Sequence, residues 1–232
     1  MGYMSIKEET KKYWGWLWNS DSWVSYIVFL VLVFILIKFI FLPFLAFAFH
    51  SELPMAIVES SSMDHAYLRY CVSYDNRGEC LGYSKDYSLC GNSLDRYDSL
   101  NFNEYWDKCG AWYEAKNISK EQMDHFSFHN GFNKGDILII IGWKKPKLGD
   151  VLLFKPNPES LSPRSVIHRI ISENPIQTKG DHNEQQLIAA NNIYHTDETY
   201  ITEDRVIGVA VLRIPYLGWL KLWVVDFFNK IF

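Results

Sequence analysis

The sequence has no excess of basic residues. Its 232 residues include 23 Lys and Arg against 27 Asp and Glu, which gives a formal net charge of −4. Proteins that bind nucleic acids usually present clustered Lys and Arg, whereas these residues are scattered here. The composition therefore argues against nucleic acid as a partner. The length suits one domain of ordinary size plus an anchor.

The four cysteines include no C-x-x-C pair. Eight, nine and eighteen residues separate them in order, at positions Cys71, Cys80, Cys90 and Cys109. Structural zinc sites usually have close cysteine pairs, so the spacing favours two disulfides over a zinc site, with free thiols as a further alternative. Four cysteines allow three connectivities, and the sequence does not choose among them. An even number of cysteines in a segment that we expect outside the cell also favours disulfides.

Charge is almost absent from one long segment. Residues 23–42 are nearly all Val, Ile, Leu and Phe, and Lys38 is the one charged residue among them. Twenty helical residues span about 30 Å, the thickness of a bilayer core. The run is too long, and too poorly flanked by small residues, for a cleaved signal peptide. We therefore expect a transmembrane helix that Pro43 interrupts, with Lys38 reaching the interface.

Lys and Arg are also missing from residues 43–60, whereas Lys7, Lys11 and Lys12 precede the apolar run. The positive-inside rule then places residues 1–22 in the cytoplasm and everything after the helix outside. Four Trp residues near the helix start are typical of an interfacial aromatic belt. We expect a single-pass protein of the cell (plasma) membrane with an extracytoplasmic domain.

After residue 131 the pattern is typical of β-structure. Apolar or β-branched runs follow Gly-Asp turns, and no long amphipathic helix intervenes. The predicted strands are residues 137–141, 151–154, 165–171, 175–178 and 206–214. We expect a mostly β domain, sandwich-like or barrel-like, built from residues 43–63 and 132–215.

Two segments do not follow this pattern. Residues 64–131 are rich in Tyr, Asn, Asp, Ser and Gly and contain all four cysteines. Their apolar periodicity is poor, so we expect an inserted, loop-rich subdomain held by disulfides. Residues 216–232 are apolar and aromatic but short for a full span. We expect an amphipathic interfacial helix there, with a second membrane crossing as the alternative.

Three polar positions suit a nucleophilic relay. Ser60-Ser61-Ser62 offers hydroxyl groups, which become reactive only beside a base. His168 lies in an apolar strand, a shielded setting that suits a base near pH 7. Asp181 follows Gly180 in a turn, and its carboxylate could orient an imidazole. Each position also has an ordinary structural interpretation: the serine run as a polar turn, His168 as a hydrogen-bonded core histidine, and Asp181 as part of a Gly-Asp turn.

Together these segments resemble type I signal peptidases, in the branch found in archaea and in the catalytic subunit of the endoplasmic-reticulum complex. Ser60-Ser61-Ser62-Met63 matches the first four places of the family's Ser-x-Ser-Met-x-Pro segment. Residues 166–170 resemble the segment with the general base, where histidine marks this branch. Residues 178–183 resemble Thr-Lys-Gly-Asp-Asn-Asn. The resemblance implies that Ser62 is the nucleophile, that Ser60 helps line the oxyanion hole and that His168 is the base.

The chain departs from the family pattern in its relay acid. Family members often have another acid about six residues beyond the Gly-Asp aspartate, and this chain has Leu187 there. Either Asp181 completes the relay, which we expect, or Asp197 reaches back from a longer loop. The family's proline after the serine motif is also missing, since Asp64-His65-Ala66 follows Met63.

The resemblance implies a membrane-bound serine endopeptidase that removes signal peptides from exported preproteins through an acyl-enzyme. The expected partners are the preprotein signal peptide, the lipid bilayer and the secretion translocon, and no metal or organic cofactor is called for. Two alternatives remain: a related membrane protease dedicated to a specific partner, and a membrane-tethered β domain that binds or scaffolds with a decayed relay. The departures from the family pattern favour the second alternative.

Overall fold

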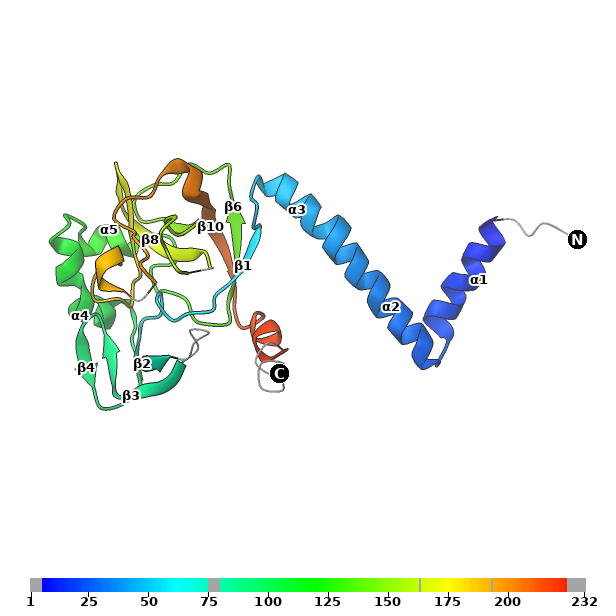
Figure 1. Ribbon diagram of the computed structural model, residues 1–232, viewed down its shortest axis with the longest axis horizontal. Helices are drawn as coiled ribbons and strands as arrows, with labels where there is room; N and C mark the ends of the chain where they lie inside the picture. Colours follow the sequence, from blue (N-terminus) through cyan, green and yellow to red (C-terminus); the bar gives the residue numbers. More distant parts are fainter. Residues whose placement is uncertain (1–5, 75–79, 163, 193, 225–232) are drawn as a thin grey trace, which may run out of the picture. The chain divides into compact units, whose positions relative to one another are not determined.

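The computed structural model describes residues 6–74, 80–162, 164–192 and 194–224. The chain divides into two compact units, Met1–Ala48 and Phe49–Phe232 (Figure 1). The first unit contains helices, and the second contains both sheets.

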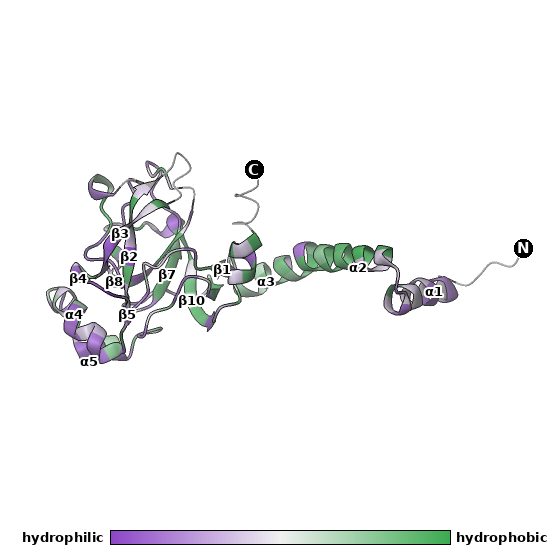
Figure 2. Ribbon diagram, turned by 90° about the horizontal axis from the view of Figure 1, so that it is seen from below, coloured by the Kyte–Doolittle hydropathy of each residue, from purple (hydrophilic) through white to green (hydrophobic). Residues whose placement is uncertain are grey.

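The first unit consists of an N-terminal helix and a long apolar helix. α1 spans Ile6–Asn19, and α2 (Trp23–Leu36), the π-helical segment η1 (Ile37–Phe41) and α3 (Leu42–Phe49) follow one another directly. Ser22 caps α2, since its hydroxyl accepts a hydrogen bond from the Val24 N–H at 3.4 Å. Residues Trp23–Phe49 are long and apolar enough to cross a membrane. Figure 2 shows α2 as almost uniformly hydrophobic (green), in contrast to α1.

The helix does not end at Pro43, and the expected interruption is wrong. Proline lacks an N–H, and in a regular α-helix its ring clashes with the carbonyl four residues earlier. Here η1 precedes it, and the Leu42 N–H bonds to the Ile37 carbonyl, five residues back. Pro43 is then the second residue of α3, where proline is tolerated. The wider turn lets the helix continue to Phe49.

A six-stranded antiparallel sheet is the framework of the second unit, with strand order β1-β6-β10-β7-β8-β9. The strands are β1 (Met55–Ile57), β6 (Ile137–Ile141), β10 (Val206–Ile214), β7 (Val151–Phe154), β8 (Val166–Glu173) and β9 (Ile176–Lys179). β1 and β9 are the edges. The five predicted strands are confirmed within two residues at each end, and the mostly β architecture is confirmed.

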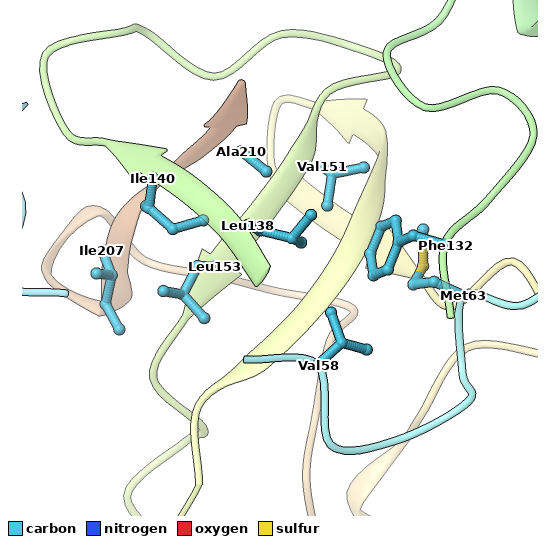
Figure 3. Close-up of a cluster of buried hydrophobic side chains, with 9 residues drawn as sticks. All are labelled: Val58, Met63, Phe132, Leu138, Ile140, Val151, Leu153, Ile207 and Ala210. Carbon is cyan, nitrogen blue, oxygen red and sulfur yellow. The ribbon is translucent and has the colours of Figure 1, made fainter. Parts of the chain in front are cut away.

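The main core cluster lies on the central strands of this sheet (Figure 3). All four residues of β7 are buried, which explains why this strand reads as a continuous apolar run. Residues from outside the strands complete the cluster: Val58 follows β1, and Met63 packs near Phe132. The other members are Leu138, Ile140, Val151, Leu153, Ile207 and Ala210.

Residues 64–131 form more regular structure than their composition predicts. A second sheet has the order β4-β3-β2-β5, and two helices follow it. Asn101 and Glu104 form a capping box that starts the longer helix, a signal readable in the sequence. Buried aromatic residues of this helix, Tyr105, Trp106 and Tyr113, belong to a second hydrophobic cluster. The elements are β2 (Ala66–Tyr74), β3 (Cys80–Leu89), β4 (Asn92–Leu94), β5 (Asp98–Ser99), α4 (Phe102–Glu114) and α5 (Lys120–Asp124).

The cysteines form two disulfides, as predicted. Cys71 pairs with Cys80 across the β2–β3 hairpin, and Cys90 pairs with Cys109, joining the end of β3 to α4. The Cα–Cα distances of 5.7 and 5.5 Å are ordinary for disulfides. All four cysteines are paired with one another, which excludes the zinc and free-thiol alternatives.

Short helical turns complete the second unit. η2 (Ala189–Asn191) and η3 (Glu203–Arg205) lie in the long connection before β10. After β10, residues 219–224 are helical, in agreement with the start of the predicted C-terminal helix. Residues 225–232 of that prediction lie outside the described residues.

Substitution of Leu153 by alanine tests the core. Leu153 is 2 % exposed and Leu161 is 68 % exposed, so the same change has different costs at the two positions. Leu153→Ala should lower the free energy of unfolding by about 2–5 kcal/mol, because it leaves a cavity. Leu161→Ala should change it by about 0.5 kcal/mol or less. Urea unfolding of the full chain in detergent, monitored by tryptophan fluorescence, measures the free energy of unfolding of both variants. Equal losses in the two variants would contradict the placement of Leu153 in the core.

Candidate active site

The serine segment leaves the sheet directly after β1. The hydroxyls of Ser60 and Ser62 lie 3.2 Å apart, within hydrogen-bond distance. Met63, the next residue, is buried in the core cluster, and its carbonyl accepts a hydrogen bond from the Phe132 N–H at 3.1 Å. The Ser62 carbonyl accepts a second one from the His182 N–H at 2.9 Å. The main chain at Ser62 is therefore held from two sides.

His168 lies in β8 opposite Leu152 of β7 and is almost fully buried. Its Nδ1 lies 2.5 Å from Oε2 of Glu198, whose side chain is completely buried. Two further donors reach the same carboxylate: the Thr178 hydroxyl at 3.0 Å and the Leu187 N–H at 2.7 Å. A carboxylate that accepts this hydrogen bond selects the tautomer with the proton on Nδ1, and in that tautomer Nε2 is an acceptor.

Gly180 brings the serine and histidine segments close together. A methyl group added at its Cα would lie 2.7 Å from the Ser62 carbonyl oxygen and 2.8 Å from Nε2 of His168. Both distances are shorter than ordinary contacts, so the close approach depends on glycine at this position. Nε2 of His168 therefore faces the backbone next to Ser62.

One cleft of about 520 Å³ contains the predicted nucleophile, its neighbour and the predicted base. Ser60 and Ser62 lie on the wall that follows β1, and His168 lies on the wall formed by the start of β8. The loop after β9 contributes Asn183, Leu187 and Tyr194, among others. The structure thus brings Ser60, Ser62 and His168 together around one space.

Asp181 has different partners from those predicted. Nε and Nη2 of Arg169 donate to its two carboxylate oxygens at 2.9 and 2.6 Å. His65 Nε2 lies 3.1 Å from Oδ2, and the Tyr113 hydroxyl donates to Oδ1 at 3.1 Å. Successive residues of a strand point to opposite faces, so Arg169 and its carboxylate lie on the other face of β8 from His168.

The charge state of Asp181 follows from these partners. Burial alone would raise the pKa of this carboxyl, but Arg169 and the hydrogen bond from His65 outweigh burial and hold the pKa far below its ordinary value. Asp181 is therefore ionised and is the counterion of a completely buried guanidinium.

Asp197, the alternative acid, faces its own turn. Its Oδ1 accepts hydrogen bonds from the N–H and the hydroxyl of Thr199 at 2.9 and 2.6 Å. The next residue, Glu198, is the carboxylate that contacts His168, and no motif in the sequence predicted this contact. The segment lies beside β9, since the Thr178 N–H bonds to the Glu198 carbonyl at 3.0 Å. The loop that contains Asp197 does supply a carboxylate to His168, but the residue is Glu198, one position after the predicted one.

Comparison with known proteins gives two curated relatives, both described as "Signal peptidase complex catalytic subunit SEC11". The one from Plasmodium falciparum is 26 % identical over 108 residues, and the one from Colletotrichum graminicola is 21 % identical over 112 residues. Each match covers 44 % of this chain, and 55 % and 60 % of the respective relatives. The chain thus spans less than two thirds of these relatives. No family model matches. The resemblance to type I signal peptidases of this branch is confirmed.

The carboxyl of Asp64, beside the serine segment, gives a test by pH. Burial, with a contribution from Asp136, raises the pKa of Asp64 from 3.8 to about 6, against the opposing effect of Arg213. Between these pH values the folded state binds more protons than the unfolded state. The free energy of unfolding contributed by Asp64 therefore decreases as pH rises from about 4 to 6.

Asp64→Asn removes this charge at every pH. The raised pKa of Asp64 corresponds to about 2 kcal/mol once its partial exposure is allowed for, so the variant should melt about 4–8 °C higher than the wild type at pH 7. At pH 4 the two should melt at nearly the same temperature, because the wild-type carboxyl is then neutral in the folded state. Thermal unfolding by circular dichroism measures the difference. Asp107→Asn, on the exposed side of α4, is the control and should give the same small shift at both pH values. A pH-independent effect of Asp64→Asn would contradict the argument.

Proposed function

From the similarity to signal peptidase catalytic subunits, we propose that this chain is a membrane-anchored serine endopeptidase that removes signal peptides from exported preproteins. One observation carries the proposal. Ser62 and His168 line the same cleft, and a buried carboxylate holds the imidazole by Nδ1. A serine becomes a nucleophile when a base with a free ring nitrogen can take its proton, and the shared cleft supports that role for His168 toward Ser62.

The proposed reaction is acyl transfer. Nε2 of His168 takes the proton of Ser62, and the Ser62 oxygen attacks the carbonyl carbon of the scissile peptide bond. His168 then gives this proton to the leaving amine, and water, deprotonated by the same nitrogen, hydrolyses the acyl-enzyme. The N–H of Ser62 and the Ser60 hydroxyl would stabilise the oxyanion. The loss of one such donor costs about 2.7–4 kcal/mol in other enzymes.

Glu198 is the relay acid in this proposal, in place of Asp181 or Asp197. It is the carboxylate in contact with His168, and two further donors fix its orientation. A buried carboxylate in this position stabilises the imidazolium that forms during the reaction. Asp181 instead balances the charge of Arg169, and Asp197 closes a local turn.

The substrate would bind as an extended chain. β1 is an edge strand of the sheet, and the cleft begins along its end and continues to Ser60 and Ser62. A peptide can add to such an edge through main-chain hydrogen bonds, while side-chain pockets select its sequence. The family resemblance favours small residues before the cleaved bond, as in Ala-x-Ala. The secretion translocon remains a proposed partner.

The apolar helix Trp23–Phe49 is the proposed membrane anchor. Lys7, Lys11 and Lys12 precede it, and residues 43–60 contain no Lys or Arg, so we infer a cytoplasmic N-terminus and an extracytoplasmic cleft. The proposed location is the cell membrane. Signal peptides cross the bilayer in the same orientation, which suits this arrangement.

Cleavage of a model preprotein by the membrane-embedded chain tests the function. The wild type should cut at the signal-peptide junction, and a serine-reactive phosphonate should label Ser62. Ser62→Ala should abolish both reactions, because the nucleophile is gone. Cleavage that persists in His168→Lys would show that the site accepts lysine as the base. If the wild type and Ser62→Ala behave alike, the chain is not a protease of this kind, and the tethered binding domain becomes the better interpretation.

Three carboxylate variants separate the relay acid from the structural acids. Glu198→Gln should lower kcat about 10²–10⁴-fold without unfolding the protein, because the amide no longer stabilises the imidazolium. Asp181→Asn should instead lower the free energy of unfolding by about 3–5 kcal/mol, because Arg169 loses its counterion.

Asp197→Asn is the matched control, and its kcat should stay within about twofold of wild type. Steady-state cleavage kinetics and urea unfolding of each variant provide the two measurements. A folded Asp181→Asn variant with the large loss of kcat, together with an active Glu198→Gln variant, would make Asp181 the relay acid.

A further inference from the structure

The turn at residues 180–182 is held from the side of the inserted subdomain. The Cys90 N–H donates to the His182 carbonyl at 3.0 Å, and the Tyr105 hydroxyl donates to the Asp181 carbonyl at 2.9 Å. The Tyr113 hydroxyl donates to the Asp181 carboxylate at 3.1 Å. Three contacts from residues 64–131 thus fix a turn that lies more than sixty positions further along the chain.

The same turn holds the nucleophile. The His182 N–H donates to the Ser62 carbonyl at 2.9 Å, and the Asp181 N–H lies 3.3 Å from the Met63 sulfur. Gly180 packs closely against both the Ser62 carbonyl and Nε2 of His168. A displacement of this turn would therefore change the position of Ser62 relative to its base.

One face of α4 makes the contacts on the insertion side. Tyr105, Cys109 and Tyr113 are each four residues apart, so they lie on the same helical face, and all three are buried. Cys109 lies between the two tyrosines and is bonded to Cys90, the residue whose N–H contacts His182. The disulfide thus joins the helix to the strand end that holds the turn.

Aromatic contacts close the same interface. The His65 ring stacks on Tyr105 with a centroid distance of 3.5 Å. The Lys179 ammonium lies 5.0 Å from the Trp112 ring and 5.1 Å from the Tyr113 ring, within the range of a cation–π contact. Burial here lowers the pKa of Lys179 to about 8, against the opposing effect of Asp181. α4 therefore seals the charged residues around the turn from solvent.

The second disulfide provides a contrast. Cys71 and Cys80 join the β2–β3 hairpin, and their sulfur atoms lie near the main-chain carbonyls of Ser73 and Gly82 in the same hairpin. Its contacts are local. The chain thus contains two disulfides in one subdomain, of which one is connected to the turn beside Ser62.

We propose that α4 and the Cys90–Cys109 disulfide position the nucleophile, with Tyr105 and Tyr113 as positioning residues. Turnover then depends on this disulfide and not on Cys71–Cys80. The inserted subdomain is therefore a structural part of the site, because it holds the turn that contacts Ser62. This inference rests on the proposed function, because turnover is its main readout.

The test compares two double variants of the full chain in detergent. Cys90→Ser/Cys109→Ser should lower kcat for preprotein cleavage about ten- to hundredfold, with KM within about twofold, because a misplaced nucleophile slows the chemical step more than binding. Cys71→Ser/Cys80→Ser should leave both within about twofold. Each variant is assayed well below its own melting temperature, so that loss of folded protein does not enter the rates.

Two tyrosine variants keep the cross-link and the aromatic rings. Tyr105→Phe and Tyr113→Phe remove one hydroxyl donor each and should lower kcat about three- to tenfold, as expected for one lost hydrogen bond. Tyr97→Phe, an exposed tyrosine of the same subdomain, is the control and should leave kcat unchanged. If Cys90→Ser/Cys109→Ser does not fold, these variants decide the question.

Amide hydrogen exchange gives a readout that does not require cleavage. A peptide spanning residues 178–186 should exchange faster in Cys90→Ser/Cys109→Ser than in the wild type, and at the wild-type rate in Cys71→Ser/Cys80→Ser. Failure of the wild type to cleave preprotein would overturn the proposed function. Wild-type cleavage with an unchanged kcat in folded Cys90→Ser/Cys109→Ser, or an equal loss in both double variants, would overturn the positioning inference alone.

Discussion

The buried ion pair of Arg169 and Asp181 organises the second unit of this chain. Both side chains are completely buried, and such charges are stable in a protein interior only when they are paired and hydrogen-bonded. The remaining donors of Arg169 reach the carbonyls of Ser127, Phe128 and Gly149 at 2.7–3.0 Å. One guanidinium thus joins β8, the turn after β9, the loop before β6 and the turn before β7. Displacement of the Asp181 turn would leave the buried guanidinium without its counterion, and displacement of one of the other segments would leave a buried N–H group without an acceptor.

Alternation along extended chain separates the structural roles at this site from the proposed chemical ones. His168 and Arg169 are neighbours in β8, and the first faces the cleft while the second faces the buried ion pair. Asp197 and Glu198 divide in the same way, one closing a local turn and the other binding His168. The neighbouring carboxylates of Asp197 and Glu198 therefore have different partners, because their side chains leave the backbone in different directions.

The inserted subdomain extends the site outward from the sheet. Its helix α4 contributes the hydroxyls and the disulfide that contact the turn at Asp181, and this turn contacts Ser62. The core cluster fixes the serine segment from the other side through Met63 (Figure 3). Ser62, the proposed nucleophile, is held between a hydrophobic core and a polar, cross-linked layer, and it still lines the cleft.

The local features of this protein were predictable from its sequence. Apolar and β-branched runs bounded by turns in residues 137–214 predicted five strands, the long apolar segment predicted a membrane-length helix, and the number and spacing of the cysteines predicted two disulfides. The serine and histidine segments, which line one cleft, were recognisable because each is a short contiguous pattern. The disulfide pairing, the contacts of α4 with the turn at Asp181 and the carboxylate that meets His168 became known only from the tertiary structure. The last contact joins residues thirty positions apart. It depends on how a loop lies against β9, and no local periodicity encodes that long-range packing.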